Sequence, residues 1–292
     1  MQRLLLCFAP TELRSAHFEP SVKDIPSEPA LYPDPYRSIV RRYIHLRYSL
    51  LPYNYTLAYE EAKWGKPLVR PLFYENNADT NLYKAEDQFM WGENILVAPV
   101  LEKNATERKL YLPGGKWYNY FTSSTFEGKQ WLTEKVTLND IPVFIKEGSF
   151  LPLADFSSVK KLNNTGDYDD KKLLIEYFPS TQKSNYTLFI DDGKTRNTLE
   201  NKQYALINFK GKNTNGIIDI YITSSGNTAI KNVARTFKIL LPGSEIKSAT
   251  INSKTVFVSK KHSMKNDLAG KNTQYVPVKF SGKLLHIKLK IK

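Results

Sequence analysis

The order of the hydrophobic patterns constrains the fold of this chain more than any other feature of its sequence. An apolar run at residues 4–8 and one amphipathic helical pattern at residues 34–64 come first, and short β-type segments occupy the rest. A buried parallel strand and its helix need neighbouring strands and helices to cover their apolar faces. We therefore expect residues 1–64 to be the end of a larger structure, and the β-rich remainder to form sandwiches that close on themselves.

The helical pattern has signals for a start, a kink and an end. Asp34 can cap free backbone amides, and Pro35 can occupy the first turn without losing a needed donor. Pro52 lacks an amide hydrogen and predicts a kink within the helix. Gly65, in a left-handed conformation and followed by Pro67, predicts the end of the helix.

The β-type segments form two series that are rich in β-branched and aromatic residues and are separated by Gly, Pro, Asn or Ser. The first series comprises residues 94–100, 108–112, 116–121, 131–138 and 143–145. The second comprises residues 173–178, 186–190, 204–209, 217–222, 236–241, 248–258, 275–280 and 284–291. Their spacing predicts two β-sandwiches.

The positive charge is concentrated at the C-terminal end. The chain has a formal charge of +13, and residues 231–292 hold thirteen Lys and one Arg against Glu245 and Asp267, a net of +12. In residues 284–292 lysines alternate with apolar residues, which indicates a half-buried strand with a solvated lysine face, and lysine is also common at sheet edges. The alternative interpretation is attraction to anionic glycans, nucleic acid or the cell envelope.

Composition excludes several classes of protein. With 292 residues, 41% hydrophobic and 13% aromatic, the chain can bury a core. Cys7 is the single cysteine, so no intrachain disulfide forms, and the four histidines show no metal-ligand spacing; we predict no structural metal and no cofactor. No run approaches the roughly 20 apolar residues of a membrane helix. The apolar run at residues 4–8 is too short for a secretory signal.

Five blocks of the sequence resemble glycoside hydrolase family 31 in the order of that family. Residues 36–55 (YRSIVRRYIHLRYSLLPYNY) resemble its last barrel helix, and four further blocks resemble the module that follows it. These are residues 67–75 (PLVRPLFYE), 88–100 (QFMWGENILVAPV), 111–120 (YLPGGKWYNY) and 141–152 (IPVFIKEGSFLP). Residues 186–195 (YTLFIDDGKT) resemble an acidic turn of the family's distal domain. The resemblance extends to about residue 225.

The resemblance implies a mainly β chain that consists of the end of a (β/α)8 barrel followed by a proximal and a distal C-terminal β-sandwich. The implied boundaries are residues 1–64 for the last strand, loop and helix of the barrel, 65–152 for the proximal sandwich and 153–292 for the distal one. Members of the family cleave or transfer α-linked glycosyl groups with retention, using two aspartates. Those aspartates belong to barrel motifs that precede this sequence in the family, so we expect the chain alone to be inactive.

The resemblance also carries over one sugar-binding segment. After the last barrel strand, members have an Arg-x-His segment whose His hydrogen-bonds sugar hydroxyls in the −1 subsite. Here His17 aligns with that role. Arg14 stands three residues before His17, and Ser15 occupies the position of the family's Arg. We predict His17 and Arg14 as substrate-binding residues, with no catalytic residue in this chain.

Two other groups of residues have simpler interpretations than catalysis or sugar binding. Asp191 and Asp192 are adjacent, would point to opposite faces of a strand and precede Gly193, so we interpret them as turn residues. The aromatic residues of the first β series could form a sugar-stacking platform, but at alternating strand positions they are more often sandwich core. These residues are Trp117, Tyr118, Tyr120 and Trp131.

Two functions follow from these observations. The first is the C-terminal part of a retaining α-glucosidase, α-xylosidase or α-glucosyltransferase. Its partners would be an α-linked oligosaccharide or glycoside and the remainder of the barrel, with no nucleic acid and no membrane span. The sequence does not determine the localisation; it is compatible with an extracellular or periplasmic parent enzyme, and we predict no signal peptide in this chain. The alternative is a non-catalytic carbohydrate-binding or structural β-sandwich protein derived from such an enzyme.

Overall fold

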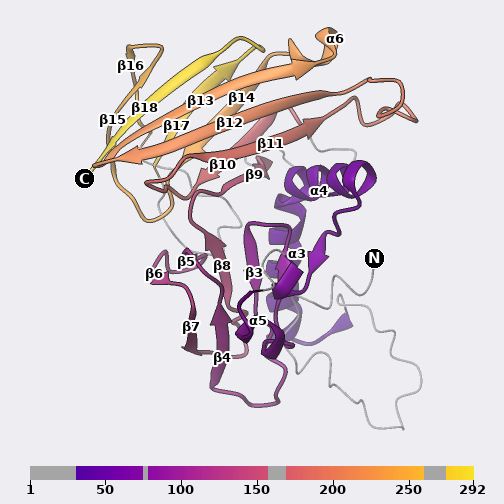
Figure 1. Ribbon diagram of the computed structural model, residues 1–292, viewed down its shortest axis with the longest axis vertical. Coiled ribbons are helices and arrows are strands. Elements are labelled where there is room, and N and C mark those ends of the chain that lie inside the picture. Colours follow the sequence, from indigo (N-terminus) through magenta and orange to yellow (C-terminus); the bar gives the residue numbers. More distant parts are fainter. Residues whose placement is uncertain (1–30, 75–77, 157–168, 260–273) are drawn as a thin grey trace. The chain divides into compact units, whose positions relative to one another are not determined.

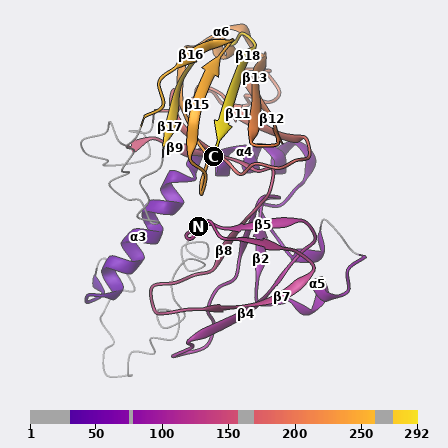
Figure 2. The ribbon, with the colours of Figure 1, turned by 90° about the vertical axis from the view of Figure 1, so that its left-hand side faces the viewer.

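A computed structural model describes residues 31–74, 78–156, 169–259 and 274–292. These residues divide into two compact units, shown from two sides in Figures 1 and 2. The first unit contains residues up to 48 together with 69–146, and the second contains residues 49–68 together with 147–292. The apolar run at residues 4–8 lies outside the described residues.

The predicted helix is present and is interrupted where the proline predicted a kink. Helix α3 (Tyr36–Ser49) is followed by helix α4 (Leu51–Trp64), which has Pro52 in its first turn. Proline cannot donate the amide hydrogen that would continue the first helix. The end is also as predicted, because Gly65 has φ 69° and its N–H donates to the carbonyl of Glu61. Asp34 accepts a hydrogen bond from the Arg37 guanidinium at 2.7 Å.

Helix α3 is attached to the first unit by a buried tyrosine. The hydroxyl of Tyr43 donates to the carbonyl of Asn139 at 2.8 Å and accepts from the amide of Ile141 at 2.9 Å. Burial raises the pKa of Tyr43, so its phenol stays protonated and keeps donating. One side chain therefore satisfies two backbone groups in the loop before β8.

The first unit is built on antiparallel strands. A six-stranded sheet has the order β1 (Val69–Arg70), β2 (Phe89–Trp91), β3 (Ile95–Val97), β8 (Val143–Lys146), β5 (Lys116–Asn119) and β6 (Thr125–Glu127). Strands β4 (Glu107–Leu112) and β7 (Gln130–Lys135) form a separate pair, visible in Figure 2. A 3-10 turn η2 (Leu72–Tyr74) and a short helix α5 (Asn81–Lys84) complete the unit. Its core includes Leu96, Leu110, Trp117 and Phe144.

The second unit is a sandwich of two sheets. The larger sheet has the order β11 (Ser184–Ile190), β12 (Ala205–Thr214), β13 (Ile217–Gly226), β18 (Leu285–Ile291), β15 (Ile246–Ile251) and β16 (Lys254–Val256). The smaller has the order β17 (Tyr275–Phe280), β14 (Arg235–Leu240), β10 (Lys172–Tyr177) and β9 (Phe150–Ala154). A short helix α6 (Thr228–Lys231) follows β13. One cluster of buried side chains is shared by both sheets, including Phe150, Phe209, Phe237 and Phe280.

The lysine-rich C-terminal segment forms a strand with the predicted alternation but not at an edge. In β18, Ile287 and Leu289 are buried while Lys288 and Lys290 are exposed. The strand lies between β13 and β15, in the interior of the larger sheet. The lysines therefore do not protect an edge; they occupy the outward face because the inward face is filled by the sandwich core.

The predicted strand at residues 248–258 is instead a hairpin of β15 and β16. Asn252 and Ser253 have φ values of 47° and 67°, so both are left-handed and form the turn of the hairpin. The pair Asn-Ser predicts such a turn less strongly than Asn-Gly would. Strands β1, β2, β6 and β9 were not predicted. The first three have only two or three residues, too few for an alternation to be read.

Helix α4 belongs to the second unit by its contacts. The amide of Phe189 in β11 donates to the hydroxyl of Thr56 at 3.2 Å, and the ring of Tyr59 stacks on that of Phe189 at 4.4 Å. Burial of an aromatic face couples the helix to the sandwich. The division into residues 1–64, 65–152 and 153–292 stays a prediction. Among the described helices, none is long and apolar enough to cross a membrane.

Gly211 in β12 marks the tightest contact within this sandwich. A Cβ at this position would lie 2.6 Å from the ring of Tyr177 and 2.8 Å from that of Phe150. Both rings are fully buried and stack on each other at 4.1 Å, so neither can move aside.

We expect Gly211→Ala to destabilise the second unit by about 1–3 kcal/mol, because one added methyl overpacks a rigid core. The measurement is urea denaturation followed by far-UV circular dichroism. Gly114→Ala is the control, since the nearest atom to its Cβ would be the end of the Lys129 side chain at 3.4 Å. Equal stabilities of Gly211→Ala and wild type would contradict this account of the core.

Candidate functional site

The two predicted substrate-binding residues lie outside the described residues. This holds for Arg14 and for His17. Their role stays a prediction. The described part of the chain contains polar clusters of its own.

The adjacent aspartates are turn residues, as predicted. Asp192 accepts hydrogen bonds from the amides of Lys194 at 3.0 Å and Thr195 at 2.8 Å, and from the Thr195 hydroxyl at 2.5 Å. These bonds, led by that of the Thr195 hydroxyl, lower the pKa of Asp192 to about 2. Asp191 accepts from the amide of Gly193 at 2.8 Å. Both carboxylates are used to hold the backbone of the turn.

Asp191 also joins the turn to helix α4. Its second oxygen accepts a hydrogen bond from the hydroxyl of Tyr55 at 2.8 Å. Burial, and then this bond to a carboxylate, raise the pKa of Tyr55. The tyrosine is therefore a hydrogen-bond donor at neutral pH and cannot act as a base there.

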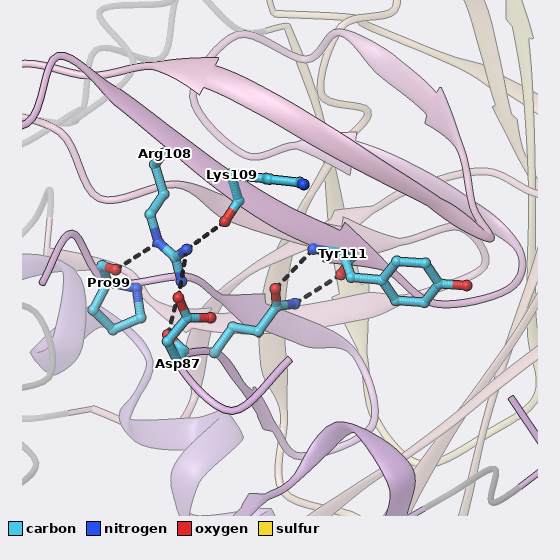
Figure 3. Close-up of polar contacts among 6 residues, drawn as sticks. Asp87, Pro99, Arg108, Lys109 and Tyr111 are labelled. Atoms are coloured by element: carbon cyan, nitrogen blue, oxygen red, sulfur yellow. Dashed lines mark hydrogen bonds and ion pairs between the residues drawn. The ribbon is translucent and has the colours of Figure 1, made fainter. Parts of the chain in front are cut away.

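The first unit contains a buried cluster around Arg108 that the sequence patterns did not predict (Figure 3). Its Nε donates to the carbonyl of Pro99 at 2.8 Å, one Nη donates to the carbonyl of Asp87 at 2.9 Å, and the other donates to the carbonyl of Lys109. The last nitrogen also lies 2.8 Å from the carboxylate of Asp87. Arg108 is 8% exposed, so these acceptors replace the water that the guanidinium lost.

Gln88 extends this cluster along the edge of β4. Its Nε2 donates to the carbonyl of Tyr111, and its Oε1 accepts from the amide of Tyr111, both at 2.7 Å. The side-chain amide thus pairs with one residue of β4 as a neighbouring strand would. Figure 3 shows the two parallel bonds beside the Arg108 contacts.

The hydroxyl of Tyr111 continues the network to Asp79, whose carboxylate accepts its hydrogen bond at 2.6 Å. Burial raises the pKa of Tyr111, and the same bond lowers the pKa of Asp79. The tyrosine is neutral and the aspartate ionised at neutral pH, and Asp79 also accepts a hydrogen bond from the amide of Asn81, the first residue of α5, at 3.1 Å.

The chemistry of the Arg108 cluster is structural. Its donors and acceptors bind one another and tie the segments before β2 and after β3 to strand β4. The sequence does contain a feature that indicates the burial of Arg108. In the alternation of β4, Arg108 lies on the same side as Leu110 and Leu112, which face inward. An arginine at an apolar phase of a strand indicates a buried partner set.

The aromatic residues of the first β series divide between core and surface. Trp117 is buried, 1% exposed, as predicted, and its indole N–H donates to the carbonyl of Pro113 at 2.8 Å. Tyr118 and Tyr120 are half-buried. Trp131 is 39% exposed, so the prediction that it belongs to the core was wrong. It lies on the outward side of the separate β4–β7 pair, where Lys109 covers its ring.

No group of three or more His, Cys, Asp or Glu side chains within the described ranges could hold a metal ion. The carboxylates of the described clusters are bound by Arg108, Tyr111, Tyr55 or turn amides. These clusters therefore hold backbone segments in place, which is a structural role.

Two family models match consecutive stretches of the chain. Residues 13–57 match the model of the glycosyl hydrolases family 31 TIM-barrel domain. Residues 65–151 match the model of the glycosyl hydrolase family 31 C-terminal domain. The barrel match contains α3 and part of α4, and the second match contains the Arg108 cluster.

Curated relatives and solved structures agree with these matches. Alpha-glucosidase 2 of Bacillus thermoamyloliquefaciens is 38% identical over 168 residues, which are 58% of this chain and 21% of the relative. An alpha-xylosidase of Saccharolobus solfataricus is 35% identical over 182 residues, 62% of this chain and 24% of the relative. A family 31 dextranase of Flavobacterium johnsoniae superposes with TM-score 0.76 at 28% identity, covering 91% of this chain and 34% of the dextranase. This chain thus spans about a fifth to a third of these three proteins.

We expect Arg108→Met to destabilise the first unit by about 2–4 kcal/mol, because one buried and two partly buried carbonyls lose their donor and Asp87 loses its partner. Three of the four tryptophans lie in this unit, so tryptophan fluorescence during urea denaturation measures its stability.

The control for this change is Arg37→Met. Arg37 pairs with Asp34 on the surface, with its side chain 48% exposed, and its loss should cost no more than about 0.5 kcal/mol. Similar losses for both variants would mean that the Arg108 contacts contribute no more than a surface pair.

We expect Asp192→Asn to lower stability at neutral pH and to have a smaller effect in acid. The folded-state pKa of Asp192, about 2, lies below its ordinary value of 3.8, so its contribution is present above pH 3.8 and is lost as the pH falls through 2. Thermal midpoints of the variant and wild type should converge between those two values. Glu200→Gln, at an exposed position after the turn, is the control, and a constant gap for Asp192→Asn across this range would contradict the assignment.

Proposed function

Since residues 13–57 and 65–151 belong to glycoside hydrolase family 31, we propose that this chain works as the C-terminal part of a retaining α-glycosidase. In this role it completes the catalytic barrel and supports it with β-sandwich modules. The observation that carries the proposal is the presence of both family modules in their family order, over a fold that superposes on a family 31 dextranase along 91% of the chain.

The proposed substrate is an α-linked glucoside or xyloside. The named relatives are an alpha-glucosidase and an alpha-xylosidase, and a related dextranase structure contains isomaltotriose. Retaining hydrolysis uses two carboxyl groups about 5–5.5 Å apart, one as nucleophile and one as acid and base. In the proposed enzyme these carboxylates belong to the barrel strands that precede residue 13 in the family.

The role proposed for His17 is to hold sugar hydroxyls at the −1 subsite. Barrel active sites form at the C-terminal ends of the strands, and residue 17 follows the predicted last strand at residues 4–8. A histidine can both donate to and accept from sugar hydroxyls. Arg14, on the same loop, would add a charged donor to the rim of the subsite.

The role proposed for the β modules is mechanical support. In the second unit, α4 packs on β11 through Thr56 and Tyr59. Tyr55 of the same helix donates a hydrogen bond to Asp191 in the turn after β11. A helix held at several points along its length is fixed on this sandwich.

The test is a chimera in which residues 13–292 of this chain replace the matching segment of the Flavobacterium johnsoniae dextranase. We expect it to hydrolyse isomaltotriose, whereas the dextranase without that segment does not. His17→Ala in the chimera should lower kcat/KM by roughly tenfold to a hundredfold, the loss of one or two sugar hydrogen bonds.

His286→Ala, in a strand of the second unit, is the matched control and should leave kcat/KM within about threefold of the parent chimera. The 292-residue chain itself should not cleave p-nitrophenyl α-glucoside above the buffer blank, because retaining catalysis needs both carboxylates. Cleavage by the chain alone, or a monodisperse folded chimera without activity, would refute the proposal. An unchanged kcat/KM in His17→Ala would refute the role of His17 alone.

A further inference from the structure

The larger sheet of the second unit has one outward face that carries a group of lysines. Strands β12, β13 and β18 lie side by side in this sheet (Figure 1). Their inward side chains are fully buried in the core, so the residues between them point outward. We call the outward group the lysine face; it consists of Lys210, Lys212, Tyr221, His286, Lys288 and Lys290, arranged around Asp219.

Strand register places these side chains in two adjacent rows. Lys210 lies opposite Tyr221, and Tyr221 opposite His286, which makes the first row. Lys212 lies opposite Asp219, and Asp219 opposite Lys288, which makes the second. Lys290 follows two residues after Lys288. The lysines are therefore about 7 Å apart along a strand and about 10 Å apart across β13.

The centre of the lysine face is rigid. The rings of Tyr221 and His286 stack at 4.3 Å with an interplanar angle of 3°. His286 Nε2 lies 2.7 Å from a carboxylate oxygen of Asp219, and Lys288 Nζ lies 3.8 Å from the same oxygen. Tyr221 is nevertheless 41% exposed, so the face presents part of an aromatic ring to solvent.

The charge of the lysine face is strongly positive. Asp219 is the single carboxylate among its residues, against four lysines that are all exposed. Clustered like charges repel one another in the folded protein, and the repulsion is relieved when a polyanion binds. The fold itself does not need this pattern, because outward positions of a sheet accept any polar residue.

We propose that the lysine face binds an anionic polysaccharide, a glycan that carries carboxylate or sulfate groups at regular intervals. Two properties favour this partner over nucleic acid. First, there is no arginine in strands β11, β12, β13, β15 and β18. Arginine is the residue that binds phosphate with two parallel hydrogen bonds. Second, one face of Tyr221 is occupied by His286, so successive bases would find no series of free rings to stack on.

Hydroxyl groups beside the lysines complete the match to a sugar chain. Thr250 of β15 lies opposite Lys288, and Thr223 of β13 lies two residues after Tyr221; both are half-buried. Such side chains hydrogen-bond sugar hydroxyls while lysines pair with the anionic groups. This proposal does not depend on the glycosidase activity, because the face belongs to the distal sandwich alone.

The experiment compares binding of dextran sulfate and of uncharged dextran of the same length to the 292-residue chain. Both probes share one sugar backbone, so a difference between them reports the anionic groups. We expect dextran sulfate to bind at least tenfold more tightly at about 50 mM salt, with an affinity that falls as salt rises.

The variant Lys210→Gln with Lys290→Gln removes one cation from each side of the face. It should bind dextran sulfate roughly tenfold more weakly and lower the slope of log affinity against log salt by about two. The control, Lys103→Gln with Lys279→Gln, changes the net charge equally at exposed positions in the first unit and on the other sheet of the second unit, and should stay within about twofold. Tyr221→Ala should lower the affinity without changing the salt slope, because it removes no charge.

Three results would overturn the proposal. One is the absence of dextran sulfate binding at low salt, and another is an equal loss of affinity in the control variant, which would assign the effect to net charge. The third is tighter binding of single-stranded poly(U) than of dextran sulfate, which would assign the face to nucleic acid. Circular dichroism of each variant verifies that the sandwich is intact.

Discussion

The second unit depends on the burial of one face of each sheet against the other. Phe150 and Tyr177 stack at 4.1 Å from adjacent strands, and Gly211 of the opposite sheet leaves room for both rings. Apolar burial of this kind supplies most of the free energy of folding, and its close packing fixes the register of the strands. Once register is fixed, each alternate residue faces outward, so the lysine face follows from the geometry of the core.

The first unit depends on side-chain hydrogen bonds, because its strands are short. Many backbone N–H and C=O groups beside these strands have no partner in a neighbouring strand. Arg108 and Gln88 satisfy these groups with side-chain donors and acceptors. A buried guanidinium is stable here because its nitrogens find acceptors in Pro99, Asp87 and Lys109. The same principle applies to Tyr43, which satisfies two backbone groups beside helix α3.

The buried contacts of both units suit the supporting role that we propose for them. The family match assigns α3 and part of α4 to the barrel, whereas the described contacts of α4 are with the distal sandwich. By its sequence match part of this helix belongs to the barrel, and by its packing the helix belongs to the sandwich. The lysine face would add to this enzyme a separate attachment to its polymeric surroundings.

Local features were predictable wherever one residue type has one conformational role. The kink at Pro52, the left-handed end at Gly65 and the turn at Asp192 all follow from constraints within four residues. Most longer strands were predictable because their apolar residues alternate. The hairpin at Asn252 was missed, since several residue pairs tolerate its conformation and none demands it. Of the candidate site, Arg14 and His17 come from family resemblance alone, and they stay predictions.

The sequence by itself determined the mainly β class, the resemblance to the family, the helix with its break, and the positive charge of the C-terminal segment. Only the tertiary structure decided that Arg108 is buried among carbonyls, that Trp131 is exposed, and that β18 is an interior strand. The reason is physical: helix breaks and turns are governed by neighbours in the chain, whereas burial depends on which distant strand covers each face. An alternating strand has the same pattern at an edge and in the middle of a sheet, and only its partners distinguish the two.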